Sequence, residues 1–216
     1  MPRNKYPERT EQAILETAKR LFLERGCESV TLQDIAAACG VTRGAIYHHF
    51  KGKEELLDGV TTYLFQETVP WEEICSEAGG SGLEKLRRLI GASASNKEQL
   101  QMYLMLAPIF YRSPKLAAAY LDSIRTQAVP LLRELLAEGM EDGSVPQGDP
   151  NALAEVVAGC TSIILSPLIF PGGEKSFRAK VQAVQTMLEG MGLPLIDGET
   201  AAAFQRLGAM FDRDQK

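Results

Sequence analysis

The chain has 216 residues, of which 45% are hydrophobic and 24% are charged. This composition is ordinary for a soluble folded protein and excludes a disordered or fibrous chain. The net charge of -5 does not by itself indicate a nucleic-acid partner, but residues 1–56 carry a net charge of +1 and the remainder -6. A nearly neutral head on an acidic body fits a protein that presents one end to a polyanion.

The four cysteines are widely spaced, and the two histidines, His48 and His49, are adjacent. These spacings match no zinc motif, so we expect no metal and no cofactor. We expect buried or half-buried thiols in a reducing cytoplasm, with a redox sensor as the alternative. The N-terminus lacks an apolar signal stretch, and the most apolar run, 153–170, contains Glu155 and Pro167. It favours a buried helix over a membrane span, so we predict a cytoplasmic protein without a membrane partner.

The first predicted helix has its apolar residues on one face, from Ile14 to Phe22. Thr10 is placed to cap its N-terminus and Gly26 to end it. The segment 31–50, TLQDIAAACGVTRGAIYHHF, then predicts two short helices joined at Gly40, which can adopt the left-handed backbone of a sharp turn. Thr31 begins a capping box, and Thr42 caps the second helix of the pair, which ends near Phe50. This is the helix-turn-helix pattern.

A further helix begins at Lys53, and helical spacing continues through the rest of the chain. After a glycine-rich link at 79–82 we predict helices over 83–95, 97–112, 114–140, 151–170, 174–191 and 199–212. Pro108 and Pro130 lie inside two of them and predict kinks. No alternating strand pattern is found, so the predicted fold is all-α. We assign residues 1–56 to a helix-turn-helix domain and residues 57–216 to a helical body.

The short helix after Thr42 exposes hydrogen-bond donors. At 100° per residue, Gly44 and His48 lie away from Ile46, while Arg43 and Tyr47 share the adjoining face. Such a helix fits a DNA major groove, where arginine can address guanine. Tyr47, Thr31 and Lys53 suit phosphate contacts, the last two because they lie at helix N-termini.

Residues 10–57 resemble the TetR/AcrR family of bacterial transcription regulators. The resemblance is carried by Ile14-Leu15, Ala18, Leu21-Phe22, Gly26, Thr31, Ile35-Ala36, Gly40-Val41, Gly44, Ile46-Tyr47, His49-Phe50, Lys53 and Leu56-Leu57. It implies a dimeric regulator, usually a repressor, that releases DNA on binding a small molecule. It also implies DNA contacts at Thr31, Gln33, Thr42, Arg43, Gly44, Tyr47, His48, His49 and Lys53.

These residues also have plainer interpretations. Tyr47 could be a core aromatic, and Arg43 a solvated surface residue. The two histidines could suggest a metal, although adjacent residues on a helix point about 100° apart. The basic residues before Thr10 could enter a minor groove or form a frayed tail.

The body offers a dimer surface and an effector pocket. Residues Phe177, Val181, Val184, Leu188 and Met191 recur at spacings of 4, 3, 4 and 3, typical of two packed helices. The preceding helix is apolar on two faces, one of them with Val157, Cys160 and Ile164. We therefore predict a four-helix bundle about a two-fold axis, the alternative being that both stripes are internal core.

An apolar or amphipathic effector would need apolar walls with a few hydroxyl groups. The candidates are Phe65, Trp71, Met102, Tyr103, Met105, Phe110 and Tyr111. For each of them, plain core is the alternative interpretation.

Two other functions compete with the regulator. The motifs of serine hydrolases, P-loop proteins and zinc proteases are absent, so we do not expect an enzyme. The second rival is a helix-turn-helix protein-interaction module, or an activator without a ligand-release mechanism.

Overall fold

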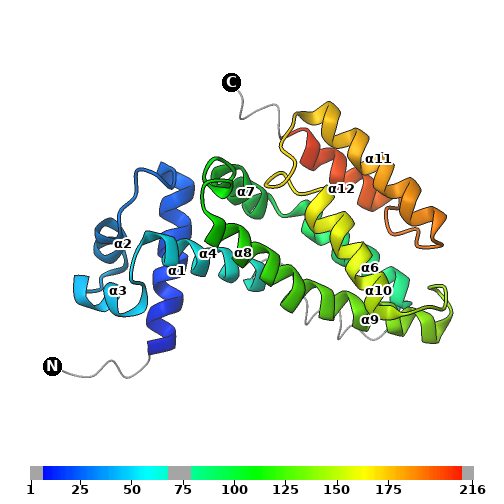
Figure 1. Ribbon diagram of the computed structural model, residues 1–216, viewed down its shortest axis with the longest axis horizontal. Helices are drawn as coiled ribbons and strands as arrows, with labels where there is room; N and C mark the ends of the chain where they lie inside the picture. The colour runs from blue at the N-terminus through cyan, green and yellow to red at the C-terminus, as the bar shows by residue number, and fades with distance from the viewer. Residues whose placement is uncertain (1–6, 68–78, 211–216) are drawn as a thin grey trace. The chain divides into compact units, whose positions relative to one another are not determined.

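The computed structural model describes residues 7–67 and 79–210 (Figure 1). Within these ranges every regular element is a helix and none is a strand, which confirms the predicted all-α class. None of the helices there is long and apolar enough to cross a bilayer. The chain folds as two compact units, residues 1–66 with 101–120 and residues 67–100 with 121–216. The predicted functional boundary at residue 56 falls inside a helix, Lys53–Glu67, and stays a prediction.

The first unit begins with four helices, α1 (Pro7–Arg25), α2 (Leu32–Cys39), α3 (Arg43–His49) and α4 (Lys53–Glu67). Their core is aliphatic and aromatic, and Ile14, Phe22 and Ile46 are completely buried. Helix α1 begins at Pro7 and not after Thr10, so the predicted cap at Thr10 is wrong. Proline suits the first turn of a helix because its missing N–H has no partner there in any case.

The first unit is completed by most of α7 (Lys97–Phe110) and most of α8 (Pro114–Ser123). The Tyr120 ring meets Tyr103 and Phe110 edge-on, with centroids 6.2 and 5.7 Å apart. Helix α8 is also tied to α4, because Lys115 Nζ lies 2.8 Å from Asp58 Oδ2. This hydrogen bond raises the pKa of Lys115, so the ammonium stays charged.

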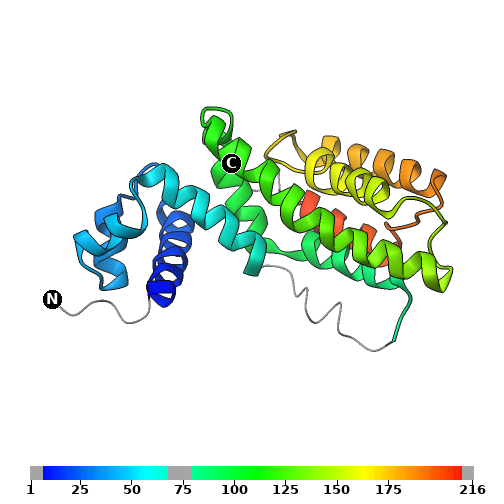
Figure 2. The same ribbon diagram turned by 60° about the horizontal axis from the view of Figure 1, so that its bottom comes forward.

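The second unit contains α6 (Gly82–Ser95), α9 (Val129–Asp142), α10 (Pro150–Ala158), α11 (Glu174–Gly190) and α12 (Gly198–Gly208). Helix α9 packs between α6 and α10, while α12 packs on α6 and α11 on α12 (Figures 1 and 2). At the start of α6, a Cβ on Gly82 would overlap the backbone of Gly139. Only glycine allows α6 and α9 to approach this closely.

Two π-helical segments interrupt the body helices, η1 (Ile124–Ala128) and η2 (Gly159–Ile164). The predicted helix 114–140 is therefore three elements, α8, η1 and α9. Segment η1 ends just before Pro130, whose ring clashes with the carbonyl four residues earlier in a regular helix. Val129 N instead bonds to Ile124 O, five residues back, which accommodates the proline. The predicted helix 151–170 ends at Ile164, and 97–112 ends at Phe110.

Three of the four cysteines lie in the described residues. Cys27 and Cys160 are buried, and Cys39 is half-buried. Burial raises the pKa of the Cys27 and Cys160 thiols, which keeps them protonated at neutral pH and poorly reactive. This agrees with the structural interpretation of these two thiols. Cys75 lies outside the described residues.

Two aspartates at helix N-termini make the free energy of unfolding depend on pH in the acid range. Hydrogen bonds from the side chain and backbone of Thr31 lower the pKa of Asp34, and the backbone N–H of Thr200 lowers that of Asp197. A lowered pKa adds stability above the unfolded value of about 3.9, and this stability is lost as the pH falls through the folded value. We expect the urea concentration at the midpoint of unfolding to decrease when the pH is lowered below about 4. Asp197→Asn keeps a capping side chain without the charge and should make this loss shallower; an unchanged pH profile would contradict the assignment.

Candidate DNA-binding surface

Helices α2 and α3 are joined by the turn that the sequence predicts. Gly40 has φ 72°, the left-handed conformation, and its N–H bonds to carbonyls at the end of α2. Val41 N bonds to Ala36 O at 3.0 Å, which closes the turn. Thr42 then caps α3 by accepting a hydrogen bond of 3.2 Å from Ala45 N. The helix-turn-helix is therefore confirmed in its local geometry.

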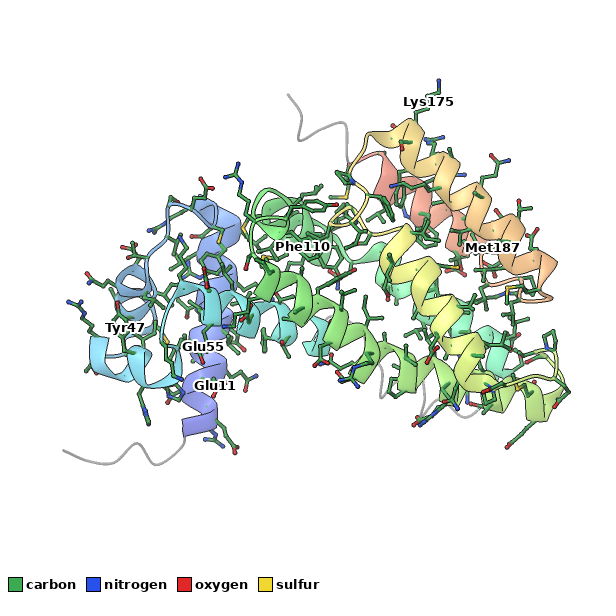
Figure 3. All side chains as sticks on the ribbon, viewed as in Figure 1. Glu11, Tyr47, Glu55, Phe110, Lys175 and Met187 are labelled. Carbon is green, nitrogen blue, oxygen red and sulfur yellow. The ribbon has the colours of Figure 1, made fainter. Side chains whose placement is uncertain are left out.

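Helix α3 is anchored by one buried residue, and its opposite face points outward. Ile46 is completely buried, whereas Arg43, Gly44 and His48 are exposed. Tyr47 is 41% exposed, and the guanidinium carbon of Arg43 lies 5.7 Å from its ring centroid (Figure 3). Tyr47 is thus not a core aromatic. The predicted sharing of one face by Arg43 and Tyr47 is also present.

Gly44 needs an explanation that the chain itself does not provide. It lies in the first turn of α3 with ordinary helical φ, and a Cβ there would meet nothing nearer than Thr42 Oγ1 at 4.0 Å. Glycine in a helix costs stability relative to alanine because it loses more backbone freedom on folding. No described residue comes close enough to Gly44 to require the absence of a side chain. A surface outside the protein that approached α3 closely would require it.

Two predicted contact residues are partly engaged inside the first unit. Thr31 forms the capping box of α2, with its hydroxyl 2.6 Å and its N–H 2.8 Å from Asp34 Oδ2. Lys53 Nζ donates to Glu28 O at 3.1 Å, which leaves two of its three N–H donors for other partners. The sequence pattern predicted the capping role of Thr31 but not the contact of Lys53 with Glu28.

His49 is turned towards α1. Its Nδ1 lies 3.6 Å from Glu11 Oε2, and its side chain is only 10% exposed, unlike the exposed His48. Glu11 lies on α1 (Figure 3) and was not singled out from the sequence, because only the fold brings it near residue 49. His49 is therefore placed to orient α3, while Gln33, Thr42 and His48 lie on the open surface.

Comparison with known proteins identifies this arrangement. The family model described as "Bacterial regulatory proteins, tetR family" matches residues 14–60. The chain is 27% identical over 188 residues to the helix-turn-helix transcriptional repressor KstR2 of Rhodococcus jostii, covering 84% of this chain and 90% of that protein. It is also 30% identical to KstR2 of Mycobacterium tuberculosis, over 60% of this chain and 66% of that protein. The chain belongs to the TetR family.

A solved TetR-family regulator from Pectobacterium atrosepticum shares the fold, with a TM-score of 0.67 and 26% identity over 88% of this chain and 97% of its own. A TetR-family structure from Mesorhizobium loti has a TM-score of 0.60 at 20% identity, covering 85% of this chain and 98% of its own, which shows the fold alone. The TetR-family protein described here is accordingly a DNA-binding transcription regulator.

The predicted effector residues of this TetR-family protein range from buried to exposed. Met102 and Phe110 are buried, Tyr103 and Met105 are half-buried, and Tyr111 is 65% exposed. Phe110 packs edge-on against both Tyr120 and Tyr111. The side chain of Phe65 and the whole of Trp71 lie outside the described residues. An effector role for this set stays a prediction.

The predicted dimer residues require a correction. The side chains already covered within the single chain, each no more than 2% exposed, are Val157, Cys160, Phe177, Val184 and Leu188. Ile164 and Val181 are half-buried. In the 4-3-4-3 stripe of α11, Val181 is therefore half-buried and Met191, at the end of the stripe, is 37% exposed, whereas Phe177, Val184 and Leu188 are internal core of the second unit, the alternative stated above. Side chains this well covered cannot form a surface for a second subunit.

Proposed function

We propose that this TetR-family regulator is a repressor that binds a palindromic operator as a homodimer and releases it when a small molecule binds. The observation that carries the proposal is the outward face of α3, with exposed Arg43, Tyr47 and His48 around a glycine that the fold does not need. The relatives named above are described as transcriptional repressors. The protein would act in the cytoplasm, where the DNA is.

The proposal is tested by selecting genomic fragments that the full-length protein binds and then titrating the enriched duplex at several salt concentrations. Binding that neutralises phosphates must weaken steeply with salt, because counterions are released. A two-fold dimer requires a palindromic site with half-sites about one DNA turn, ~34 Å, apart. A protein-interaction module would enrich no sequence and show no such salt dependence.

Two side chains of α3 should separate affinity from specificity. Arg43→Ala should reduce the preference for one base pair of the operator by about 1–3 kcal/mol, because arginine addresses guanine edges. Tyr47→Ala should weaken all duplexes alike, because its hydroxyl suits a phosphate. Competition titrations against single-base operator variants measure both effects. Equal losses on every sequence for both variants would show that Arg43 does not read bases.

The dimer surface that we propose lies on the outer flanks of α10 and α11. Val156 is 40% exposed, Met187 42% and Met191 37%. On α11, Ala179 and Ala183 precede Met187 at four-residue spacing and are also exposed. Exposed apolar side chains on neighbouring helical turns are typical of a protein interface. Segment η2, which continues α10, packs on α11, so the two helices belong to one packed layer.

The effector remains proposed as an apolar or amphipathic small molecule bound near the aromatic residues of α7. The half-buried Tyr103 and Met105 support this, since a hydroxyl and a flexible thioether suit such a ligand. A series of candidate molecules can be tested by the release of labelled operator. Tyr103→Phe should change the concentration needed for release without changing operator affinity.

A further inference from the structure

A hollow lies in the second unit, between α6 and α12. It has a volume of about 680 Å³. Its lining includes the small residues Gly91, Ala92 and Ala203 and the buried Thr200. A Cβ on Gly91 would lie 3.7 Å from Thr200 Oγ1, so the two helices pack closely beneath the hollow. The effector candidates that the structure describes, Met102, Tyr103, Met105, Phe110 and Tyr111, are not among its lining residues.

Six charged residues also line this groove, three of them arginines and three carboxylates. Two carboxylates are already satisfied by the chain. Asp197 caps α12, accepting from Thr200 N at 3.0 Å, and Glu84 accepts from Ser81 N at 2.7 Å. Hydrogen bonding to Thr200 N holds the pKa of Asp197 below its ordinary value, so this carboxylate is committed to its charged, capping state.

Two of the arginines, Arg87 and Arg206, have donors left over. Arg87 uses Nε on Pro194 O at 2.8 Å and lies 3.6 Å from Asp197, which leaves the other N–H groups of a guanidinium that has five. Arg206, on α12, is exposed and makes no hydrogen bond or ion pair with the residues that the structure describes. Glu199 lies seven residues before it, about 10 Å along the helix axis. An anion at Arg206 therefore need not meet that carboxylate.

We propose that the groove between α6 and α12 binds a small polar molecule through an anionic group, a carboxylate or a phosphate. The guanidinium of Arg206 receives the anion, because planar N–H pairs match both groups in two-point hydrogen bonds. The rest of the molecule lies on the floor of small residues, between the rims formed by α6 and α12. The volume falls in the range of small-molecule sites. This site is additional to the proposed operator and effector sites and does not depend on them.

Calorimetric titration of the full-length protein tests the site, with citrate and inorganic pyrophosphate as separate probes at constant ionic strength. We expect saturable binding of at least one probe, at one molecule per chain, and the probe that binds distinguishes carboxylate from phosphate recognition. Arg206→Gln should weaken it about tenfold or more, the loss of a charge-assisted hydrogen bond. Arg133→Gln removes the same charge from an exposed position on α9 and should leave binding unchanged.

A second variant separates the groove from general charge attraction. Ala92→Leu fills the hollow without changing any charge and should also abolish binding. If thermal melting shows that this variant is misfolded, Gly91→Ala takes its place, since its methyl group has ordinary contact distance to Thr200. The proposal is overturned if neither probe binds saturably, or if binding persists in both Arg206→Gln and the folded steric variant.

Discussion

Replacing Gly44 with alanine is expected to weaken operator binding by about tenfold or more while leaving the protein as stable as before, or more stable. The added methyl group has free space inside the protein, with Thr42 Oγ1 as its nearest neighbour at 4.0 Å. It would instead project from the surface that we propose meets DNA. If the methyl group holds α3 away from the duplex, several phosphate hydrogen bonds are lost at once. These are the contacts that fix the register of the helix on DNA.

In Gly44→Ala the free energy of unfolding should rise while the affinity for the operator falls. Alanine in place of glycine restricts the unfolded chain and favours the helix, by up to about 1 kcal/mol. Urea unfolding measures this term, and fluorescence anisotropy with labelled operator measures affinity. Gly198→Ala is the matched control, because Gly198 is also exposed in a helical first turn with open space around it. Equal operator affinity in the two variants would place the DNA contact elsewhere.

The local features of the head could be predicted from the sequence because short-range chemistry determines them. Thr31, Gly40 and Thr42 form a cap, a turn and a second cap with residues at most five positions away. The exposure of Arg43 and Tyr47 likewise follows from helix periodicity around Ile46. These contacts depend on the angle per residue and not on the rest of the fold.

The long-range contacts could not be predicted in the same way. His49 meets Glu11 only because α1 packs against the helix-turn-helix, and Lys53 meets Glu28 O only because the start of α4 lies beside the turn that follows α1. No sequence spacing indicates either pair. For α11, periodicity correctly identified an apolar stripe but did not show what covers it. A stripe that packs within its own chain and one that packs against a second chain have the same pattern.

The outer flank of α10 did leave a weak signal. Ala152, Val156, Gly159 and Ile163 follow one another at spacings of 4, 3 and 4, beside the stripe that contains Val157. The apolar stripe of this helix that was predicted to form the dimer surface turns inward at Val157 and Cys160, and so does the apolar face next to it. Ala154, Ala158 and Leu165 are as well buried as Val157. Burial within the single chain is the information that decides between the faces.

Val156→Glu and Met187→Glu are each expected to convert the dimer to folded monomers. Both side chains are about two-fifths exposed in the single chain, so a carboxylate there is solvated in the monomer. In a two-fold interface the same substitution occurs twice and buries two unpaired charges, at a cost of several kcal/mol. Light scattering should show the mass of one chain, and operator affinity should fall because a monomer contacts a single half-site.

Two controls make this result specific to the outer flank. Gln182→Glu adds the same charge to the exposed side of α11 about 140° around the helix from Met187, and the dimer should persist. Val184→Glu places the charge in the core of one chain, where Val184 is 2% exposed, so we expect unfolding instead of dissociation. If Val184→Glu gave a folded monomer while Met187→Glu stayed dimeric, the inner stripe would be the interface, and α11 would have to leave its own core to form it.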